Sequence, residues 1–281
     1  MKKIISLILA LTLGLTAMFA LNSCGGTEDD NTAKTKVAAQ VGTTSLMYAN
    51  VLKGVDVVSY DTFALAAQDM KNGNAAYVFV DKTTAKALCN EIKGIKYIDI
   101  ALSSENYGIG IDKNQAGLKD QIDAILESKA AEIEAIKTKY MNNEEEKYVG
   151  VTSATKDVNK AATQLVVATN AEFAPWEYKE GDKFYGIDME IAAILAAELD
   201  MELVIEDMAF DNVVGSVGKQ GIDIAMSGIT ITAEREAVVN FSTPYYVEDI
   251  VVVCKADDKT FDNAKTVVDI LTTLCSSAEE E

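Results

Sequence analysis

The sequence predicts an α/β protein that is built from two lobes. Short apolar runs alternate with helix-spaced patterns over residues 36–141, and the same alternation resumes at Leu165. This alternation is typical of mostly parallel sheets whose strands are joined by helices. A polar, aperiodic stretch from Asn142 to about Thr163 separates the two segments. We interpret that stretch as a linker.

The elements of the first segment follow from the spacing of apolar residues. Strands are expected at residues 37–41, 55–58, 76–80 and 107–111, and helices at 45–52, 62–71 and 118–140. Ligands of such sheets bind beyond the carboxyl ends of the strands. Residues that follow a strand directly are therefore the first candidates for a site.

The second segment repeats the pattern. Strands are expected at residues 165–169, 201–205 and 222–226. Helix 187–199 carries Asp188 and Glu190 in its first turn, where the helix dipole favours acidic side chains. Asp211 and Thr232 are expected to cap the two helices that follow.

The composition excludes several classes of protein. The 281 residues carry 25 Lys and Arg against 44 Asp and Glu, and the resulting formal charge of −19 repels nucleic acid. Histidine is absent, which removes the Ser-His and Cys-His nucleophile pairs and nearly every His-containing zinc site. We expect no cofactor and no metal, so any chemistry must use carboxylates, lysines, hydroxyls or the backbone.

The N-terminus has the pattern of a secretory signal. Lys2 and Lys3 precede an uncharged run, Ile4 to Leu21. A basic start, an apolar core and a small residue before the cut describe a signal peptide over residues 1–23. The alternative is a membrane-spanning anchor, because the apolar run only just reaches spanning length.

Leu21-Asn22-Ser23-Cys24 resembles the bacterial lipobox, in which the cysteine becomes the first residue of the mature protein and carries lipid. Two or more acyl chains anchor a protein stably, where a single chain does not. The resemblance implies an extracytoplasmic protein that is attached to the bacterial cell membrane through Cys24, with residues 24–35 as its tether.

Three further cysteines, Cys89, Cys254 and Cys275, lie in the rest of the chain. In an oxidising compartment this number allows one disulfide and leaves one thiol over. Their spacing resembles no metal site, and we interpret each as a small buried hydrophobic residue.

Arg235 is the only arginine in the chain. Guanidinium differs from ammonium because it offers a planar fork to a carboxylate or phosphate, so Arg235 is a candidate anion clamp. Gly228-Ile229-Thr230-Ile231-Thr232 precedes it, and its backbone N–H groups and the Thr230 hydroxyl are candidates for the same anion. The alternative is a surface ion pair with Glu234 or Glu236.

Gly42-Thr43-Thr44-Ser45 repeats this arrangement in the first segment, directly after a strand and before a helix. Ordinary helix capping by serine and threonine is the alternative interpretation. The segment has too few glycines and no lysine for a P-loop, so nucleotide binding is not expected.

Aromatic residues cluster near the strand ends of the second segment. Phe173-Ala174-Pro175-Trp176 follows a strand, and Tyr178 and Phe210 lie close by. Aromatic residues belong most often to the core. Their clustering directly after a strand instead indicates the wall of a pocket.

Asp81 follows the apolar strand Tyr77-Val78-Phe79-Val80 and therefore lies at its carboxyl end. The alternative role for Asp81 is to cap a helix that begins near Thr83. An acid in one lobe and an arginine in the other suit a zwitterion. That combination predicts an amino acid as the ligand.

Three motifs occur in order in the second segment: Ala168 to Tyr178 (ATNAEFAPWEY), Gly186 to Ile191 (GIDMEI) and Gly228 to Arg235 (GITITAER). Asn240 to Tyr246 (NFSTPYY) completes them. Residues 166–255 thereby closely resemble the first lobe of the polar-amino-acid-binding proteins of ABC importers, which are solute-binding proteins of family 3. The resemblance implies a two-lobed, periplasmic-binding-protein-like (Venus-flytrap) fold of the second type.

Residues 36 to about 141 resemble the later part of the same family. The resemblance rests on Gln40-Val41-Gly42-Thr43-Thr44, on Lys71-Asn72-Gly73 leading to Asp81, and on Tyr107-Gly108-Ile109-Gly110 through Lys139-Tyr140. The family order is thus inverted, and we interpret the chain as a circular permutant whose usual ends are joined by the linker. Permutation is tolerated where termini lie close together at the surface. A truncated tandem and an intermolecular exchange of lobes are the alternatives.

The permuted order assigns a role to each part of the chain. Residues 36–105 form lobe 2, 106–142 the closing strand and helix of lobe 1, 143–163 the linker, 164–250 the main part of lobe 1, and 251–281 a crossover segment toward lobe 2. Residues 266–281 must then find a place beside the strand at Val37.

The resemblance also implies which residues hold the charged groups of the ligand. Arg235, Thr230 and Thr43 would hold its α-carboxylate. Asp81 and the carbonyl of Gly228 would take its α-ammonium group.

The same resemblance implies contacts to the ligand's side chain. Phe173 and Phe210 would wall it, with Trp176 in the same cleft, and Asn170 and Gln40 occupy positions that contact it in relatives. Since Asn170 and Gln40 are uncharged, we expect a neutral or polar amino acid rather than a basic one.

These observations predict a non-enzymatic amino-acid-binding lipoprotein that closes its lobes around the ligand and presents it to ABC permease subunits. One alternative is an enzyme on the same fold, such as a dehydratase. The lack of histidine and of a spare cleft acid beyond Asp81 counts against an enzyme, although Glu172 is available as an acid. Another alternative is a ligand sensor without transport.

Overall fold

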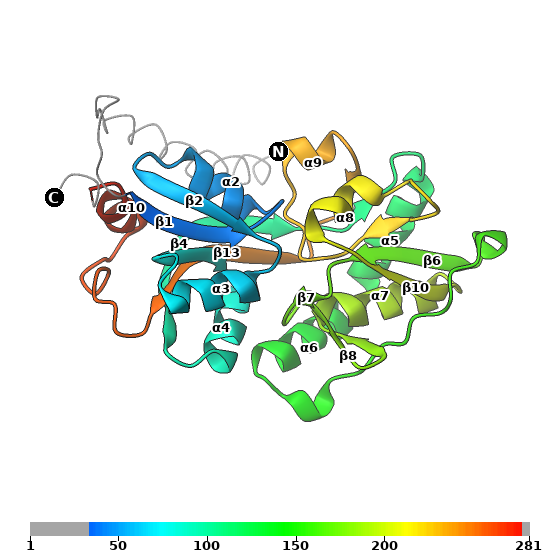
Figure 1. Cartoon of the computed structure of the whole chain (residues 1–281). Helices are drawn as coiled ribbons and strands as arrows, with labels where there is room; N and C mark the ends of the chain where they lie inside the picture. Colours follow the sequence, from blue (N-terminus) through cyan, green and yellow to red (C-terminus); the bar gives the residue numbers. More distant parts are fainter. Residues whose placement is uncertain (1–33, 277–281) are drawn as a thin grey trace, which may run out of the picture. The chain divides into compact units, whose positions relative to one another are not determined.

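The computed structural model describes residues 34–276. They divide into two units: unit 1 comprises 34–40, Ser45–Ser104 and 249–276, and unit 2 comprises Val41–Thr44 and Glu105–Glu248. Each unit has its own five-stranded sheet with helices packed on it (Figure 1). The predicted fold class, an α/β protein with two lobes, is confirmed. The signal peptide expected at 1–23, the lipidated Cys24 and most of the tether lie outside the described residues.

The sheet of unit 1 has the strand order β2-β1-β3-β13-β4. Its strands are β1 (Thr35–Gln40), β2 (Val55–Tyr60), β3 (Tyr77–Asp81), β4 (Ile95–Tyr107) and β13 (Tyr246–Lys255). β1 pairs in parallel with both β2 and β3, whereas β13 runs antiparallel to β3. β4 and β13 each continue from one unit into the other. The carboxyl ends of β1 and β3 therefore lie side by side at one edge of unit 1.

Four helices cover this sheet: α2 (Thr44–Val51), α3 (Phe63–Asn72), α4 (Lys82–Glu91) and α10 (Val267–Ser276). α3 begins after Thr62, whose hydroxyl accepts a hydrogen bond from the Leu65 amide, and it ends at Gly73 in the left-handed conformation. α2 and α10 lie on one face of the sheet, and α3 and α4 on the other (Figure 1).

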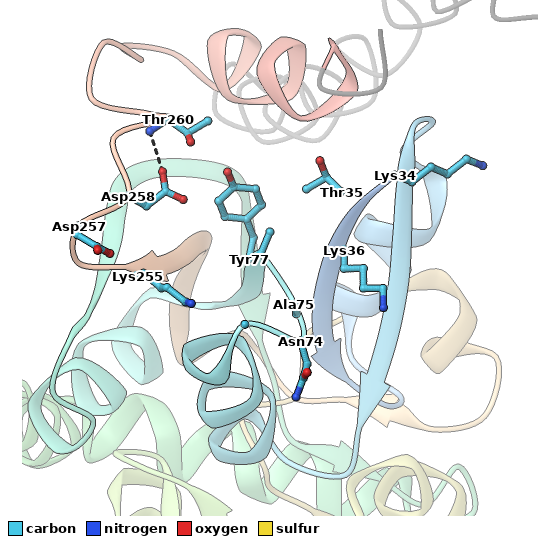
Figure 2. A pocket seen from close by; sticks show the side chains of 12 residues that line it. Lys34, Thr35, Lys36, Asn74, Ala75, Tyr77, Lys255, Asp257, Asp258 and Thr260 are labelled. Carbon is cyan, nitrogen blue, oxygen red and sulfur yellow. Dashed lines mark hydrogen bonds between the residues drawn. The ribbon is translucent and has the colours of Figure 1, made fainter. Parts of the chain in front are cut away.

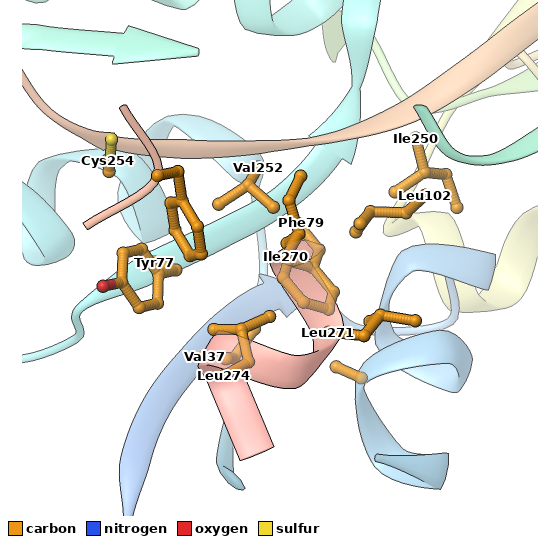
Figure 3. Packing of buried hydrophobic residues seen from close by; sticks show 12 residues of the cluster. Val37, Tyr77, Phe79, Leu102, Ile250, Val252, Cys254, Ile270, Leu271 and Leu274 are labelled. Carbon is orange, nitrogen blue, oxygen red and sulfur yellow. The ribbon is translucent and has the colours of Figure 1, made fainter. Parts of the chain in front are cut away.

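The core of unit 1 joins the two ends of the described chain. Val37 of β1 and Phe79 of β3 pack in one buried cluster with Ile270, Leu271 and Leu274 of α10 (Figure 3). All five side chains are at most 2% exposed. The segment expected to find a place beside the strand at Val37 is thus a helix with an apolar face on that strand.

The main sheet of unit 2 has the order β10-β6-β11-β5-β12. Its strands are β5 (Gly110–Ile111), β6 (Gln164–Thr169), β10 (Glu202–Asp207), β11 (Ile224–Ala225) and β12 (Asn240–Phe241). β6 pairs in parallel with β10 and β11, and β5 is antiparallel to β11 and β12. A small antiparallel sheet adds β7 (Glu172–Phe173), β8 (Glu177–Glu180) and β9 (Lys183–Tyr185).

The helices of unit 2 are α5 (Ala116–Ser128), α6 (Ala130–Met141), α7 (Ile187–Glu198), α8 (Phe210–Ser216) and α9 (Ala233–Glu236). The single helix predicted at 118–140 is wrong, because the chain breaks at Lys129, which has φ −99° and ψ 12°. The Lys129 ammonium pairs with Glu198 of α7 at 2.7 Å. Ile125 of α5 and Ile133 of α6 are both buried on either side of the break.

The two predicted helix caps of unit 2 differ in outcome. Thr232 caps α9, because its hydroxyl accepts a hydrogen bond from the Arg235 amide at 3.2 Å. The cap predicted at Asp211 is wrong, since α8 begins one residue earlier, at Phe210, with Ala209 at the N-cap. Asp211 instead lies in the first turn, where its charge suits the helix dipole.

The stretch interpreted as a linker lies along unit 2. It contains two short 3₁₀ helices, η2 (Glu145–Lys147) and η3 (Val158–Lys160). The Val151 amide donates to the Phe184 carbonyl at 2.7 Å, and the Ala154 amide donates to Leu203 at 2.8 Å. The Glu190 carboxylate accepts from the Val149 amide at 3.1 Å. Backbone hydrogen bonds to α7, β9 and β10 therefore hold a segment that is polar and aperiodic in sequence.

Candidate ligand-binding site

Arg235 lies in α9, after the loop that follows β11. Its Nη1 donates a hydrogen bond to the Thr230 carbonyl at 2.8 Å, and its Nη2 donates to the Gly42 carbonyl at 3.0 Å. The guanidinium carbon lies 5.6 Å from the centre of the Phe210 ring, a cation–π distance. Arg235 thus ties together the two Gly/Thr segments, around Gly42 and Thr230, that the sequence predicts as anion sites.

Gly42 allows the segment Val41–Thr44 to lie in unit 2. Its φ of +78° is in the left-handed region, which favours glycine. A β-carbon on Gly42 would lie 2.9 Å from the α-carbon of Asp211, closer than real contacts allow. The backbone of this segment therefore packs directly on the start of α8.

A carboxylate that the sequence analysis missed lies at this place. Glu105 Oε2 accepts hydrogen bonds from Thr44 Oγ1 at 2.6 Å and from Thr230 Oγ1 at 2.7 Å. Thr44, the neighbour of the predicted Thr43, thus brings its hydroxyl to within 3.5 Å of the Thr230 hydroxyl. No motif marks Glu105 in the sequence, since it lies in a run of polar residues, Ser103 to Asn106, near the end of β4.

Gly228 lies under two aromatic rings. Its φ is +51°, and a β-carbon there would lie 2.8 Å from Phe173 Cε1 and 3.1 Å from Tyr107 Cε2. The Gly228 amide donates to Asp188 Oδ2 at 2.9 Å. Glycine is therefore required for the close approach of the rings as well as for the turn.

Trp176 is fully buried in an aromatic cluster behind Gly228. Its ring centre is 5.0 Å from Tyr107 and 4.7 Å from Tyr246, both in edge-to-face geometry. Tyr107 is the ring that also contacts Gly228. Trp176 is thus linked to the predicted site through Tyr107, and Phe173 packs closely on the same Gly228.

Two buried acids lie beneath the same loop. Asp188 is fully buried and accepts hydrogen bonds from the Tyr245 hydroxyl at 2.8 and 2.9 Å. Glu177 faces Asp188 and accepts from the Ser227 hydroxyl at 2.7 Å. Burial raises the pKa of Asp188 to about 6, although the hydrogen bonds from Gly228, Tyr245 and Glu177 lower it.

Asn170 is fixed by its neighbours in unit 2. Its side-chain amide donates to the Met208 carbonyl at 3.0 Å, and its backbone amide donates to the Ser227 hydroxyl at 3.1 Å. Ser227 in turn donates to Glu177. A chain of hydrogen bonds therefore leads from Asn170 to the buried acids.

Asp81 and Gln40 lie in unit 1, at the carboxyl ends of β3 and β1. Asp81 is the N-cap residue of α4, but its side chain makes no capping hydrogen bond. The Gln40 side-chain amide donates to the Asp61 carbonyl at 2.9 Å. Both are at most 6% exposed. The other predicted ligand residues lie in unit 2, so the set of predicted ligand residues includes members of both units.

Residues 165–276 match the bacterial extracellular solute-binding proteins, family 3. Residues 165–276 of the chain belong to this family. The matched residues include β6, the Gly228–Arg235 loop and α9. They therefore contain most of the side chains described above for unit 2.

Two curated relatives illustrate how far the likeness extends. The arginine-binding extracellular protein ArtP of Bacillus subtilis is 37% identical over 94 residues, which are 34% of this chain and 37% of that protein. Cyclohexadienyl dehydratase of Pseudomonas aeruginosa is 37% identical over 82 residues, which are 29% of this chain and 31% of that protein. The chain thus spans less than half the length of either relative.

One solved structure is similar to part of the chain. It is the arginine-bound form of domain 1 from TmArgBP, which is 31% identical. The match covers 45% of this chain and 100% of that one, at a TM-score of 0.30.

This family-3 protein also has a cavity of about 810 Å³ in unit 1, at the amino ends of β1 and β3 (Figure 2). Three lysines line it, Lys34, Lys36 and Lys255, together with Asp257 and Asp258. Gln40 and Asp81 lie at the opposite ends of these strands, so the cavity is separate from these two predicted ligand residues.

The three cysteines of residues 34–276 are free thiols. Cys254 and Cys275 are buried as the sequence predicts, whereas Cys89 is only half-buried. Within the same range, no group of three or more Cys, Asp and Glu side chains could hold a metal ion. No helix of the described family-3 chain combines the length and the apolar character needed to cross a membrane.

Proposed function

We propose that this family-3 protein binds a free amino acid and that Arg235 holds the ligand's α-carboxylate. The observation that carries the proposal is the fixed position of the chain's one guanidinium, which two backbone carbonyls hold at 2.8 and 3.0 Å. Both bonds are made by the terminal nitrogens, so they fix the plane of the guanidinium. The planar group is thereby oriented before a ligand arrives, which lowers the entropy cost of binding.

The ligand's other groups are assigned by the same proposal. The hydroxyls of Thr230 and Thr43 complete the carboxylate site, and the Gly228 carbonyl receives the α-ammonium group. Asp81 of unit 1 is the counter-charge for that ammonium group. Its place at the carboxyl end of β3, where ligands of such sheets bind, supports this role.

The identity of the amino acid has two competing indications. Asn170 and Gln40 are uncharged, which favours a neutral or polar ligand. Several relatives are named for arginine, among them ArtP. Arginine is therefore the first ligand to test, and glutamine is the matched neutral one.

We place the protein outside the cytoplasmic membrane, held by lipid on Cys24. Contacts of the ligand with residues of both units would favour closure by hinge motion of β4 and β13, which run between the units. The closed form would deliver the amino acid to the permease subunits of an ABC importer. Ligand-bound protein that does not stimulate uptake by permease subunits would instead favour a sensor.

The proposal is tested by titrating the protein with the twenty amino acids by calorimetry, with Trp176 fluorescence as a second signal. Arg235→Ala should weaken binding about 100-fold, equal to ~3 kcal/mol, because a charged, bidentate partner is lost. Arg235→Lys should recover only part of this loss, since ammonium lacks the fork.

The matched control is Lys219→Ala, which removes one exposed positive charge from unit 2 and should leave the affinity unchanged. Circular dichroism checks that each variant is folded. An Arg235→Ala protein that is folded and binds as the wild type does would refute the assignment.

An enzyme is the second candidate, because cyclohexadienyl dehydratase matches 82 residues of the chain. A dehydratase would need an acid placed to protonate a leaving hydroxyl, and Glu172 is an exposed acid next to Phe173. Loss of water from a cyclohexadienyl substrate, abolished in Glu172→Gln, would support the enzyme. Amino-acid binding without turnover would support the solute-binding role.

A further inference from the structure

The carboxylate of Glu105 is hydrogen-bonded to two threonine hydroxyls near Arg235. Its Oε2 accepts a hydrogen bond from Thr44 at 2.6 Å and another from Thr230 at 2.7 Å. Arg235 donates to the carbonyl of the same Thr230. The proposed function assigns the Thr230 hydroxyl to the ligand's carboxylate. In this structure that hydroxyl already donates its hydrogen bond to a carboxylate oxygen of Glu105.

The end of β4 fixes this position. Tyr107 forms an antiparallel bridge with Thr230, the Ile231 amide donates to the Asn106 carbonyl at 2.8 Å, and the Gly108 amide donates to the Ile229 carbonyl at 3.0 Å. Glu105, two residues before Tyr107, is therefore a diagonal neighbour of Thr230 on the same face of the pair. Its side chain reaches Thr230 without any rearrangement of the backbone.

A threonine hydroxyl has one proton, so a Thr230 hydroxyl that donates to Glu105 cannot donate to a ligand at the same time. We propose that Glu105 is an internal competitor that the ligand's α-carboxylate displaces from Thr44 and Thr230. Because this role rests on the proposed function, it takes Arg235 and Thr230 as the carboxylate site. Two carboxylates side by side also repel each other, which favours exchange over shared occupancy.

Competition of this kind lowers affinity and raises selectivity. A ligand with its own carboxylate replaces both hydrogen bonds that Glu105 gives up. A ligand that has no carboxylate either leaves Glu105 bonded to the two hydroxyls or displaces it and leaves them without a charged acceptor. Both outcomes disfavour binding. Glu105 thus acts as a selectivity residue for the α-carboxylate, although it makes no contact with the bound ligand.

The test compares Glu105→Gln and Glu105→Ala with the wild type by calorimetry, using the amino acid that the wild-type protein binds best. Glu105→Gln should bind about tenfold more tightly, because a neutral amide is a weaker acceptor and does not repel the ligand. Glu105→Ala should bind at least as tightly as Glu105→Gln. Glu234→Gln, an exposed acid next to Arg235, is the control for the loss of one negative charge and should stay within about twofold.

Thermal unfolding gives a second readout. Without ligand, Glu105→Ala should melt at a lower temperature than the wild type, because Thr44 and Thr230 lose their charged acceptor. Saturating ligand should then raise its melting temperature by more than it raises that of the wild type.

The possible outcomes are distinguishable. A wild-type protein that binds no amino acid overturns the proposed function and the competitor role together. A wild-type protein that binds, with Glu105→Gln binding equally or more weakly, overturns the competitor role alone. Tighter binding by Glu234→Gln to the same degree also overturns it, because the effect would then be one of net charge.

Discussion

Asp188 is a single residue whose environment changes its chemistry. A carboxyl with no exposed surface loses hydration in its charged form, which is why its pKa is raised to about 6 from an ordinary 3.8. Its hydrogen bonds with Gly228 and Tyr245 link it to the loop that carries the proposed ligand residues. Glu177 faces Asp188 and is buried with it, so water solvates neither carboxyl group well and the two groups titrate as a pair.

The raised pKa predicts how stability depends on pH. Between about pH 4 and pH 6 the folded Asp188 keeps a proton that the unfolded chain has lost, so its contribution to stability falls as the pH rises through 6. The difference is about 2 kcal/mol between pH 4 and pH 7. Asp188→Asn stays neutral at every pH and should therefore gain stability relative to the wild type as the pH rises.

Urea unfolding of both proteins from pH 4 to pH 8 measures this difference. Asp182→Asn, at an exposed turn, is the control and should show no such trend. A difference between Asp188→Asn and the wild type that is constant over this range would contradict the assignment.

At the scale of elements, the short segment between β1 and α2 decides where the anion site forms. Val41–Thr44 lies between two elements that pack in unit 1, yet it belongs to unit 2. Arg235 donates a hydrogen bond to the Gly42 carbonyl of this segment, and the Thr44 hydroxyl donates one to the Glu105 carboxylate. A side chain at Gly42 would push this segment off α8.

Gly42→Ala should therefore weaken amino-acid binding about tenfold or more and lower the melting temperature. The physical reason is a β-carbon 2.9 Å from the Asp211 backbone, added to the cost of a left-handed alanine of about 1–2 kcal/mol. Calorimetry and thermal unfolding measure both effects.

Gly181→Ala is the matched control, because Gly181 also has a positive φ, of +62°, but open space around its β-carbon position. Gly181→Ala should lose stability only through the conformational cost of a left-handed alanine, and its affinity for the amino acid should be unchanged. Equal binding by Gly42→Ala and the wild type would mean that the segment is not part of the site.

At the scale of the whole molecule, the ends of the described chain lie close together in unit 1. Thr35 pairs with Val55 in the β1–β2 ladder. A β-carbon on the adjacent Gly54 would lie 3.2 Å from the Cys275 carbonyl oxygen. Proximity of this kind is what permutation requires. Circular permutation remains a prediction from the order of the family motifs.

The prediction is tested by restoring the family order. A chain that runs from Ala161 to Ser276, through a short Gly/Ser connection, and from Lys34 to Lys160 opens the molecule in the exposed η3 region. It should fold, elute as a monomer and bind the same amino acid with a similar affinity. Failure to fold, with the original order folding normally, would favour a truncated tandem, and a dimer of the original chain would favour lobe exchange.

Sequence reasoning succeeded where the physical signal is local. Apolar periodicity predicted the two α/β lobes, the Thr232 cap lies three residues from the amide it binds, and the family motifs occur in unbroken runs. The lone Arg235 stood out by composition alone. The misplaced cap at Asp211 and the undivided helix at 118–140 are local errors of one residue and one break.

The amino-acid sequence was sufficient to predict the fold class, the resemblance of residues 166–255 to family 3 and the charged residues from which an anion site can be built. The folded structure was needed to find that Gly42 bonds to Arg235, that Thr44 and Thr230 share Glu105, and that Asp188 is a buried acid under Gly228. The reason is that these contacts join residues far apart in the chain. Their energies depend on burial and on how closely the backbone segments pack, and neither property can be read from a periodic pattern in the sequence.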